Sequence, residues 1–183
     1  MSTATATPTR TTWKIDPAHS HVEFAVRHLM ITTVRGRFGD VQGTVVTDET
    51  DPGKAAADVT IAANSIDTRE PQRDAHLKSA DFFDAEKFPA LTFKSTAVTD
   101  VKGDRFKLVG DLAMHGVTKQ VTLDVTAEGR GKDPWGGERA GYSATTKVNR
   151  SDYGLIWNQV LETGGFAVGD EIKISLDLEL IKT

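Results

Sequence analysis

Apolar and polar residues alternate with a period of two along much of this chain, and this alternation restricts its fold more than any other feature. Successive side chains of a β-strand point to opposite faces, so the pattern gives each strand one apolar and one polar face. The clearest cases are residues 121–128 and 172–180. Weaker versions occupy residues 20–28, 34–46, 55–63, 90–99, 105–114 and 140–150. The sequence therefore predicts an all-β, antiparallel protein with eight long strands.

Turn-forming segments separate these predicted strands. They are rich in Gly, Pro and Asp and read DETDPGK (48–54), KGD (102–104), HGVTK (115–119) and GKDPWGGE (131–138). Eight strands joined in sequence order can close into an up-and-down barrel, which leaves no strand edge exposed. We therefore expect an eight-stranded antiparallel up-and-down barrel. A two-sheet sandwich would show similar alternation, so the pattern alone does not separate these two folds.

Two stretches interrupt the alternation. Residues 64–89 contain TREPQRDAHLKSAD, in which the early Pro71 and the run of helix-forming residues predict one short inserted helical segment. Residues 151–169 form a long connection rich in Gly, Asp and Asn, with Trp157 inside it. In an up-and-down arrangement both stretches lie at the same end of the barrel. Because ligand entrances favour loop-rich ends, we expect the entrance there.

Length and composition exclude several classes of protein. The chain has 183 residues, which fits a single domain, expected over residues 13–183 after a flexible N-terminal tail over residues 1–12. Its formal charge of −4 opposes sequence-independent binding to nucleic acid, so no nucleic-acid partner is expected. No apolar run reaches the length of a signal peptide or of an integral membrane segment, which favours a cytoplasmic protein.

The sequence offers little support for catalysis or for a metal site. It lacks the nucleophile elbow, the zinc-binding helix, the P-loop and the dinucleotide-binding turn, and it contains no cysteine. His19 and His21 lie two residues apart on one side of an extended segment, but zinc needs at least three protein ligands. His76 and His115 are interpreted as surface or turn residues. We therefore expect no enzyme activity, no cofactor and no metal.

Several long motifs resemble those of the YceI-like family, the lipocalin-like polyisoprenoid-binding proteins of bacteria. These motifs are HSHVEFAVRHLMITTVRGRF, SIDTREPQRDAHLKSADFFDAEKFPALTF, GDLAMHGVTKQVTLDV, RSDYGL and VGDEIKISLDLEL, in that order. The resemblance implies a lipid-binding barrel whose apolar pore sequesters or carries an isoprenoid-type lipid ligand, such as a prenyl lipid, a prenyl phosphate or an isoprenoid quinone. Gln120 and Tyr153 depart from the residues common in the family. Some members are exported to the periplasm, although no leader is recognised here.

The resemblance also turns the inward-facing residues of the predicted strands into candidate pore residues. Any one of them could equally be an ordinary core residue, since apolar side chains fill small barrels without a ligand. The alternatives are therefore a structural or stress-associated module with a filled core, or a pore for a fatty-acid derivative. The candidate pore residues are Val22, Phe24, Val26, Phe38, Phe93, Leu108, Leu112, Met114, Val148 and Trp157.

Three basic residues at the loop-rich end are candidates for contact with a lipid head group. His28, Lys119 and Arg150 continue the apolar faces of their strands, so their side chains are expected to face inward at the entrance. Cations there could pair with a phosphate or another acidic head group. The alternative is that they end in solvent or pair with nearby carboxylates. A homodimer is possible only as the commonest kind of oligomer.

Overall fold

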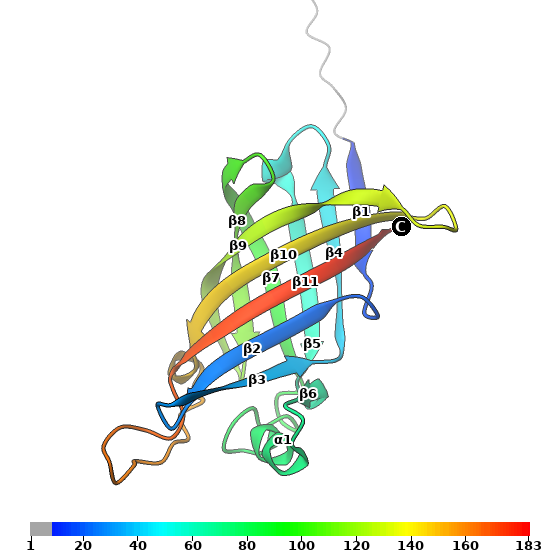
Figure 1. Ribbon diagram of the computed structural model, residues 1–183. Helices are drawn as coiled ribbons and strands as arrows, with labels where there is room; N and C mark the ends of the chain where they lie inside the picture. Colours follow the sequence, from blue (N-terminus) through cyan, green and yellow to red (C-terminus); the bar gives the residue numbers. More distant parts are fainter. Residues whose placement is uncertain (1–8) are drawn as a thin grey trace, which may run out of the picture.

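The computed structural model describes residues 9–183, and the part of the expected tail that covers residues 1–8 lies outside the described residues. Eleven strands form one antiparallel sheet. They are β1 (Arg10–Ile15), β2 (His21–His28), β3 (Thr32–Phe38), β4 (Val41–Asp48), β5 (Ala56–Ala62), β6 (Ile66–Asp67), β7 (Ala90–Lys102), β8 (Arg105–Met114), β9 (Val117–Lys132), β10 (Glu138–Asn149) and β11 (Glu171–Lys182). The helix α1 (Pro71–Lys78) lies under one end of the sheet (Figure 1).

The sheet closes on itself through the pairing of β1 with β11. Three walls of the barrel each consist of two strands that follow one another end to end. Strands β1 and β2 form the first of these walls, because they pair with successive parts of β11. Strand β4 pairs with β1 and β3 with β2, which makes the second wall, and β5 pairs with β4 and β6 with β3, which makes the third. Counted in this way, eight walls follow one another in sequence order around the barrel. The predicted eight-stranded antiparallel barrel is confirmed.

Strand β1 is one of two strands that the alternation did not predict, and the other is the two-residue strand β6. Strand β1 begins at Arg10, so residues 10–12, which were expected in the tail, belong to the barrel wall. Trp13 and Ile15 point inward and are buried, and the indole Nε1 of Trp13 donates a hydrogen bond of 3.0 Å to Oγ1 of Thr47. A strand of six residues with two inward apolar side chains is too short to give a clear pattern.

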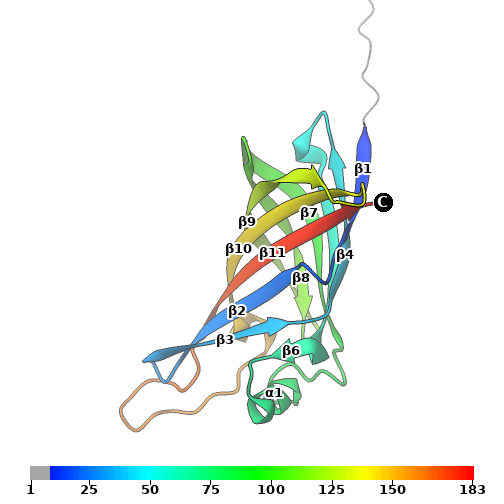
Figure 2. The same cartoon turned by 45° about the vertical axis from the view of Figure 1, so that its right-hand side comes forward.

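Helix α1 begins where the sequence predicted it. Pro71 is the first helical residue, and the side chain of Glu70 caps the helix by accepting hydrogen bonds from the backbone N–H groups of Gln72 and Arg73. The chain on either side of the helix folds back beneath the barrel (Figure 2). The inserted segment therefore covers one end of the barrel, which we call the α1 end.

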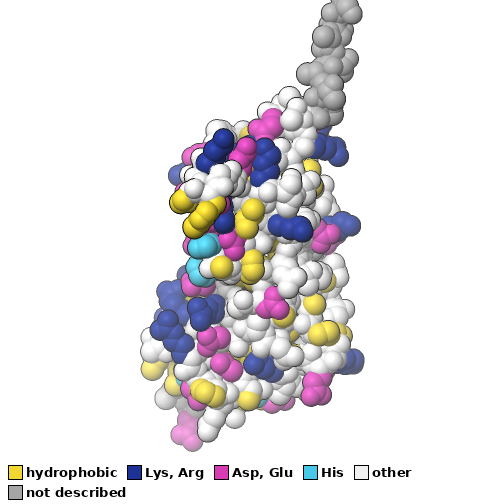
Figure 3. Space-filling model, turned by 90° about the vertical axis from the view of Figure 1, so that its right-hand side faces the viewer, with side chains coloured by type: hydrophobic (Ala, Val, Ile, Leu, Met, Phe, Trp, Pro, Cys, Tyr) yellow, Lys and Arg dark blue, Asp and Glu magenta, His cyan; other side chains and the backbone are white. Residues whose placement is uncertain are grey.

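The outer wall carries the polar halves of the alternating strands. On the face drawn in Figure 3, lysine, arginine and acidic side chains are mixed, with hydrophobic side chains scattered between them. Ion pairs join neighbouring strands, as between Lys107 of β8 and Asp124 of β9, whose Nζ and Oδ1 atoms lie 2.8 Å apart. The apolar faces of the same strands point to the interior, so the inside of the barrel is lined by apolar side chains.

Candidate ligand cavity

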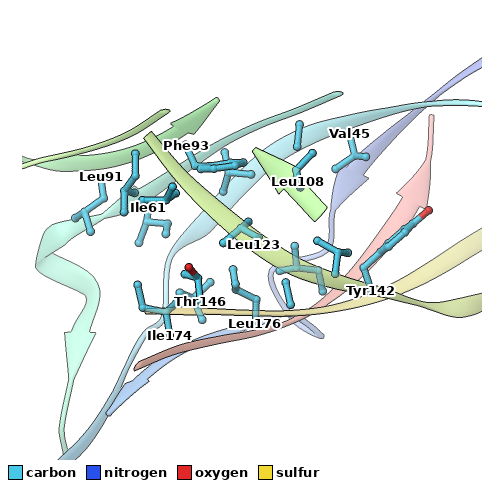
Figure 4. A pocket seen from close by; sticks show the side chains of 18 of the residues that line it. Val45, Ile61, Leu91, Phe93, Leu108, Leu123, Tyr142, Thr146, Ile174 and Leu176 are labelled. Atoms are coloured by element: carbon cyan, nitrogen blue, oxygen red, sulfur yellow. The ribbon is translucent and has the colours of Figure 1, made fainter. Parts of the chain in front are cut away.

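The interior of the barrel contains an elongated cavity of about 450 Å³. Side chains from the walls of the barrel point into it, and nearly all of them are aliphatic or aromatic (Figure 4). A volume of this size falls within the range of pockets that hold small organic ligands. The core of this barrel is therefore not filled by its own side chains, which argues against the alternative of a structural module with a filled core.

Nine of the ten candidate pore residues line this cavity. They lie on the inner faces of their strands, and an inward residue in a barrel wall faces the cavity. These nine are Val22, Phe24, Val26, Phe38, Phe93, Leu108, Leu112, Met114 and Val148.

Trp157 is the exception among these candidates and does not line the cavity. Its ring packs at the α1 end instead, with its centroid 4.7 Å from that of His76 and 5.4 Å from that of Phe82. It belongs to the irregular connection 151–169, where no strand alternation fixes the direction of a side chain. The expectation for Trp157 as a pore residue is therefore corrected to a role in packing against the α1 segment.

Strands β9, β10 and β11 supply lining residues that the list of candidates omitted. Strands β9 and β11 carry the clearest alternation in the sequence and β10 a weaker one, so a sequence signal for these lining residues was present. Their lining residues are Val121, Leu123, Val125, Ala127, Tyr142, Ala144, Thr146, Ile172, Ile174, Leu176, Leu178 and Leu180.

Two glycines in the walls make room for aromatic rings inside the barrel. A Cβ atom on Gly36 would lie 2.4 Å from Cζ of Phe24, and a Cβ atom on Gly110 would lie 2.5 Å from Cζ of Phe93. The far end of each ring therefore occupies the space that a side chain at the glycine would fill. Larger residues at these two positions would push the rings into the cavity.

Aromatic side chains close the α1 end of the cavity. The ring of Phe38 lies with its centroid 5.8 Å from that of Phe24 in the wall and 5.8 Å from that of Phe83 in the segment after α1. Leu77, Phe82 and Phe83 of this segment all line the cavity, and Phe82 is 8% exposed. The segment 71–88 therefore acts as an apolar plug.

The opposite end of the barrel is open, which corrects the expected position of the entrance. There the cavity reaches the turns between β4 and β5 and between β7 and β8, where Pro52, Val101 and Gly103 line it. Val101 is 44% exposed even though it belongs to the lining. The prediction placed the entrance under the long segments, but those segments fold over their end of the barrel and close it.

Polar groups gather at this open end. Nη1 of Arg130 donates a hydrogen bond of 2.7 Å to Oε1 of Glu49, and the Arg130 guanidinium lies 5.1 Å from the ring centroid of Trp13. Asp48 is buried, and its Oδ1 accepts hydrogen bonds from the hydroxyl and backbone N–H of Thr50, which lower the pKa of the carboxyl group. Arg130, Glu49 and Asp48 all line the cavity, so the open end is the polar end of an otherwise apolar cavity.

The three predicted head-group residues are not brought together. Arg150 is 6% exposed and lines the cavity, whereas Lys119 is exposed and neither it nor His28 is part of the lining. Lys119 and His28 lie at the ends of their strands, beyond the end of the cavity. A side chain that faces inward there does not contact the cavity. The sequence pattern gave the direction of the side chains but not the length of the cavity.

Arg150 is held by backbone carbonyl groups. Its Nε donates to Gly169 O at 2.9 Å, and its Nη1 donates to Leu155 O at 2.7 Å and to Trp157 O at 2.9 Å. Its Nη2 donates to Val168 O at 3.3 Å. Burial lowers the pKa of this guanidinium. The side chain therefore fixes the connection 154–169 to the barrel, and most of its donors have partners within the chain.

His19 takes part in a charged cluster around Arg139. Nδ1 of His19 lies 2.9 Å from Oδ2 of Asp16, and Nη1 of Arg139 lies 2.6 Å from the same oxygen and 2.7 Å from Oε1 of Glu179. The hydrogen bond from His19 lowers the pKa of Asp16, and in turn raises the pKa of His19. A guanidinium thus occupies the space between the two carboxylates, and the cluster ties the break between β1 and β2 to β10 and β11.

Within residues 9–183, no helix is both long enough and apolar enough to cross a membrane.

Comparison with known proteins agrees with this architecture. Protein YceI of Salmonella newport (strain SL254) is 43% identical over 145 residues, which cover 78% of this chain and 75% of that protein. The crystal structure of BcnA from Burkholderia cenocepacia matches with a TM-score of 0.79 at 24% identity, over 90% of this chain and 98% of that one. That of the Campylobacter jejuni YCEI protein matches with a TM-score of 0.72 at 30% identity, over 86% and 90% of the two chains.

A polyisoprenoid binding domain from Saccharophagus degradans shares the fold, with a TM-score of 0.66 at 14% identity over 94% of this chain and 99% of that one. The family model described as the YceI-like domain matches residues 13–180, nearly the whole described chain. The resemblance seen in the sequence is thereby confirmed, and the chain belongs to the YceI-like family.

Proposed function

We propose that this protein binds the long apolar chain of an isoprenoid-type lipid inside the barrel and sequesters or carries it. The observation that supports this most directly is the elongated apolar cavity, plugged at the α1 end and open at the other. A prenyl chain is long, narrow and apolar, and it matches that shape. The name of the Saccharophagus degradans domain, which describes polyisoprenoid binding in the same fold, agrees with the proposal.

The lining of the cavity indicates how affinity and selectivity are divided. Burying some twenty apolar carbons at about 0.8 kcal/mol each gives a gross gain of about 16 kcal/mol before ordering costs. Non-covalent affinity saturates near about 18–21 kcal/mol, so a polar contact adds little to the total. The chain of the lipid therefore supplies the affinity, and the polar groups at the open end select its orientation and head group.

A binding role without turnover also follows from what the cavity offers. Its walls are aliphatic and aromatic over most of their length, and the charged groups at the open end, such as Arg130 and Glu49, are paired with each other. Such groups suit recognition of a polar lipid end better than proton transfer. We therefore propose a carrier or storage protein.

The first test is to identify what the native protein contains. Protein purified without detergent is extracted with organic solvent, and the extract is analysed by mass spectrometry under denaturing conditions. A co-purifying prenyl lipid, prenyl phosphate or isoprenoid quinone in near-stoichiometric amount supports the proposal. A fatty-acid derivative would change the lipid class, and protein free of any amphiphile that also takes up none when offered would overturn it.

Two matched variants test whether the lipid occupies the cavity. Ala144 of β10 lines the cavity between Val125 and Leu176, its partners on the adjacent strands, so Ala144→Trp fills the middle of the cavity. The next residue, Thr145, is exposed on the outer face, so Thr145→Trp adds the same ring outside. We expect lipid uptake to be lost in Ala144→Trp and kept in Thr145→Trp. Equal uptake by both variants would place the lipid elsewhere.

A further inference from the structure

Large apolar side chains are exposed together at one corner of the molecule. They come from the turn between β2 and β3 and from the hairpin-like loop that precedes β11, which lie side by side beyond the barrel wall in both ribbon views (Figures 1 and 2). Ile31 and Val160 are 73% and 78% exposed, and Phe166 is 55% exposed. We call this group the apolar tip; its members are Leu29, Met30, Ile31, Val160 and Phe166.

Backbone hydrogen bonds join the two parts of the tip into one unit. The N–H of Leu29 donates to Ala167 O at 2.8 Å, and the N–H of Gly169 donates to Arg27 O at 2.9 Å. Within the loop, Val160 and Phe166 form an antiparallel bridge. The loop therefore extends the sheet along the end of β2, and its apolar side chains are held next to those of the turn.

The turn in the tip has residues that its backbone disfavours. Leu29 and Met30 have φ angles of 51° and 63°, and the N–H of Ile31 donates to His28 O at 3.1 Å, so these two residues are the central residues of a tight β-turn within the three-residue connection 29–31. Such turns normally contain Asn-Gly, because bulky residues in the left-handed region carry a conformational cost. Two bulky apolar residues at strained, exposed positions are not explained by packing within the described chain, so a contact outside it is indicated.

The shape and charge of this corner favour a lipid surface as that contact. The tip consists of protruding turns and not of a groove, and the hydrogen bonds described above satisfy much of its backbone, as a segment entering lipid requires. The β2–β3 hairpin, residues 21–38, carries three arginines and one glutamate, although the whole chain has a charge of −4. The part of the loop that carries the tip, residues 156–168, adds one acidic residue, Glu162, so this part and the hairpin together have a formal charge of +1, with Arg37 paired with Asp67.

We propose that the apolar tip docks on the surface of an anionic lipid bilayer, with Met30, Ile31 and Phe166 entering the interface and the hairpin arginines Arg27 and Arg35 facing the head groups. Apolar insertion combined with attraction between basic residues and anionic lipid is the usual basis of peripheral membrane binding. This proposal goes beyond the binding of a lipid in the cavity and does not depend on it, because the tip lies outside the cavity lining.

The turn allows a variant that removes the apolar side chains without weakening the fold. In the double variant Leu29→Asn, Met30→Gly, the new residues suit the left-handed backbone, so the thermal unfolding temperature should stay the same or rise. Binding is measured by flotation with vesicles of phosphatidylglycerol and phosphatidylethanolamine. We expect the partition coefficient of the double variant to fall at least tenfold, and that of Phe166→Asp to fall similarly.

Trp135 provides the matched control. It is 87% exposed in the turn between β9 and β10, at the other end of the barrel, so Trp135→Ser removes an exposed aromatic ring outside the tip. We expect Trp135→Ser to bind vesicles like the unchanged protein. We also expect binding to be weaker on phosphatidylcholine vesicles and to fall with added salt, because of the arginines.

Three results would overturn the proposal. The first is that the unchanged protein does not float with anionic vesicles. The second is that the double variant floats as well as the unchanged protein. The third is that vesicle binding is absent and light scattering shows a changed oligomeric state in the double variant, which makes the tip a contact with another protein chain. Lipid extracted from the cavity is measured on the same samples. If vesicle binding fails while the cavity still contains lipid, only the docking proposal is wrong.

Discussion

Arg150 gives the sharpest test of how the closed end of the barrel is held together. The variant Arg150→Met removes the guanidinium while keeping much of the apolar stem in place. It eliminates the hydrogen bonds to the carbonyl groups of Gly169, Leu155, Trp157 and Val168, of which the one to Val168 is the longest at 3.3 Å. If these bonds fix the connection 154–169, their loss must appear as a large loss of stability.

The size of the loss follows from the three shorter bonds. A hydrogen bond with a charged partner contributes about 1.5–3 kcal/mol, and a buried carbonyl left without a donor costs about 1–3 kcal/mol. Relief from burying the cation and access of water to the freed carbonyls offset part of this. We therefore expect the free energy of unfolding to fall by about 3–5 kcal/mol, against a total of about 5–15 kcal/mol for a typical domain.

The assay is urea unfolding followed by circular dichroism, with Arg37→Met as the control. Arg37 is exposed, and its Nη2 lies 3.3 Å from Oδ2 of Asp67, so its loss should cost less than about 1 kcal/mol. Limited proteolysis should in addition cut Arg150→Met within 154–169 before any other site. A loss of stability no larger in Arg150→Met than in Arg37→Met would refute the reasoning, and would return Arg150 to the role of a head-group ligand.

Three further outcomes follow from the packing and charge of the barrel. Gly110→Ala should lower stability by about 1–3 kcal/mol in thermal unfolding, because its Cβ would meet the ring of Phe93 at 2.5 Å, whereas Gly131→Ala, with open space around it, should be neutral. Trp13→Phe should cost about 1–3 kcal/mol in urea unfolding through its lost hydrogen bond and volume, and an unchanged midpoint would contradict the burial of the indole. The pKa of Asp16 is lowered in the folded protein, so its stabilising effect is present above its unfolded pKa, near 3.9, and is lost as the pH falls through the lower folded value. Asp16→Asn should therefore lower the free energy of unfolding at neutral pH, and on acidification this free energy should fall less in the variant than in the unchanged protein. Parallel curves of unfolding free energy against pH for the two proteins would contradict this.

The alternation of apolar and polar residues was enough to predict most of the fold. It identified all eight walls, because each wall has an apolar inner face and a polar outer face over at least part of its length, as β11 does with Ile172, Ile174, Leu176 and Leu178. It also gave the inward direction of nine candidate residues that line the cavity, since an inner face in a closed barrel is a cavity face, although many other lining residues were not among the candidates. It did not identify β1, which is short, although Trp13 is among the most buried residues of the chain.

The position of the entrance could not be obtained from the same pattern. The alternation of inward and outward positions along a strand gives the direction of a side chain. Whether an end of the barrel is open depends instead on how the connecting segments fold over that end. Phe82 and Phe83 have no periodicity that shows they plug the barrel; their role arises from contacts with residues far away in the sequence, such as Phe38. Arg150 shows the same limit, because its carbonyl partners belong to a loop without regular structure.

The closed α1 end and the apolar tip lead together to one prediction about how lipid would leave the barrel. Both lie at the same end, so docking through the tip turns the α1 plug toward the bilayer and the open end away from it (Figure 1). Within the described chain, residues 68–88 make their hydrogen bonds inside the segment 67–88, and they contact the barrel through apolar side chains such as Phe83 on Phe38. Contacts of this kind can be exchanged for lipid without leaving buried polar groups unpaired.

We therefore expect anionic vesicles to increase amide hydrogen exchange in residues 68–88 while the strands stay protected, because opening of the plug is local and the strand ladder is not broken. The control is the tip variant Leu29→Asn, Met30→Gly, in which vesicles should leave the exchange of this segment unchanged. Vesicle binding without any change in residues 68–88 would show that the plug stays closed on the membrane. In that case lipid would have to move through the open end, and docking through the tip would serve attachment alone.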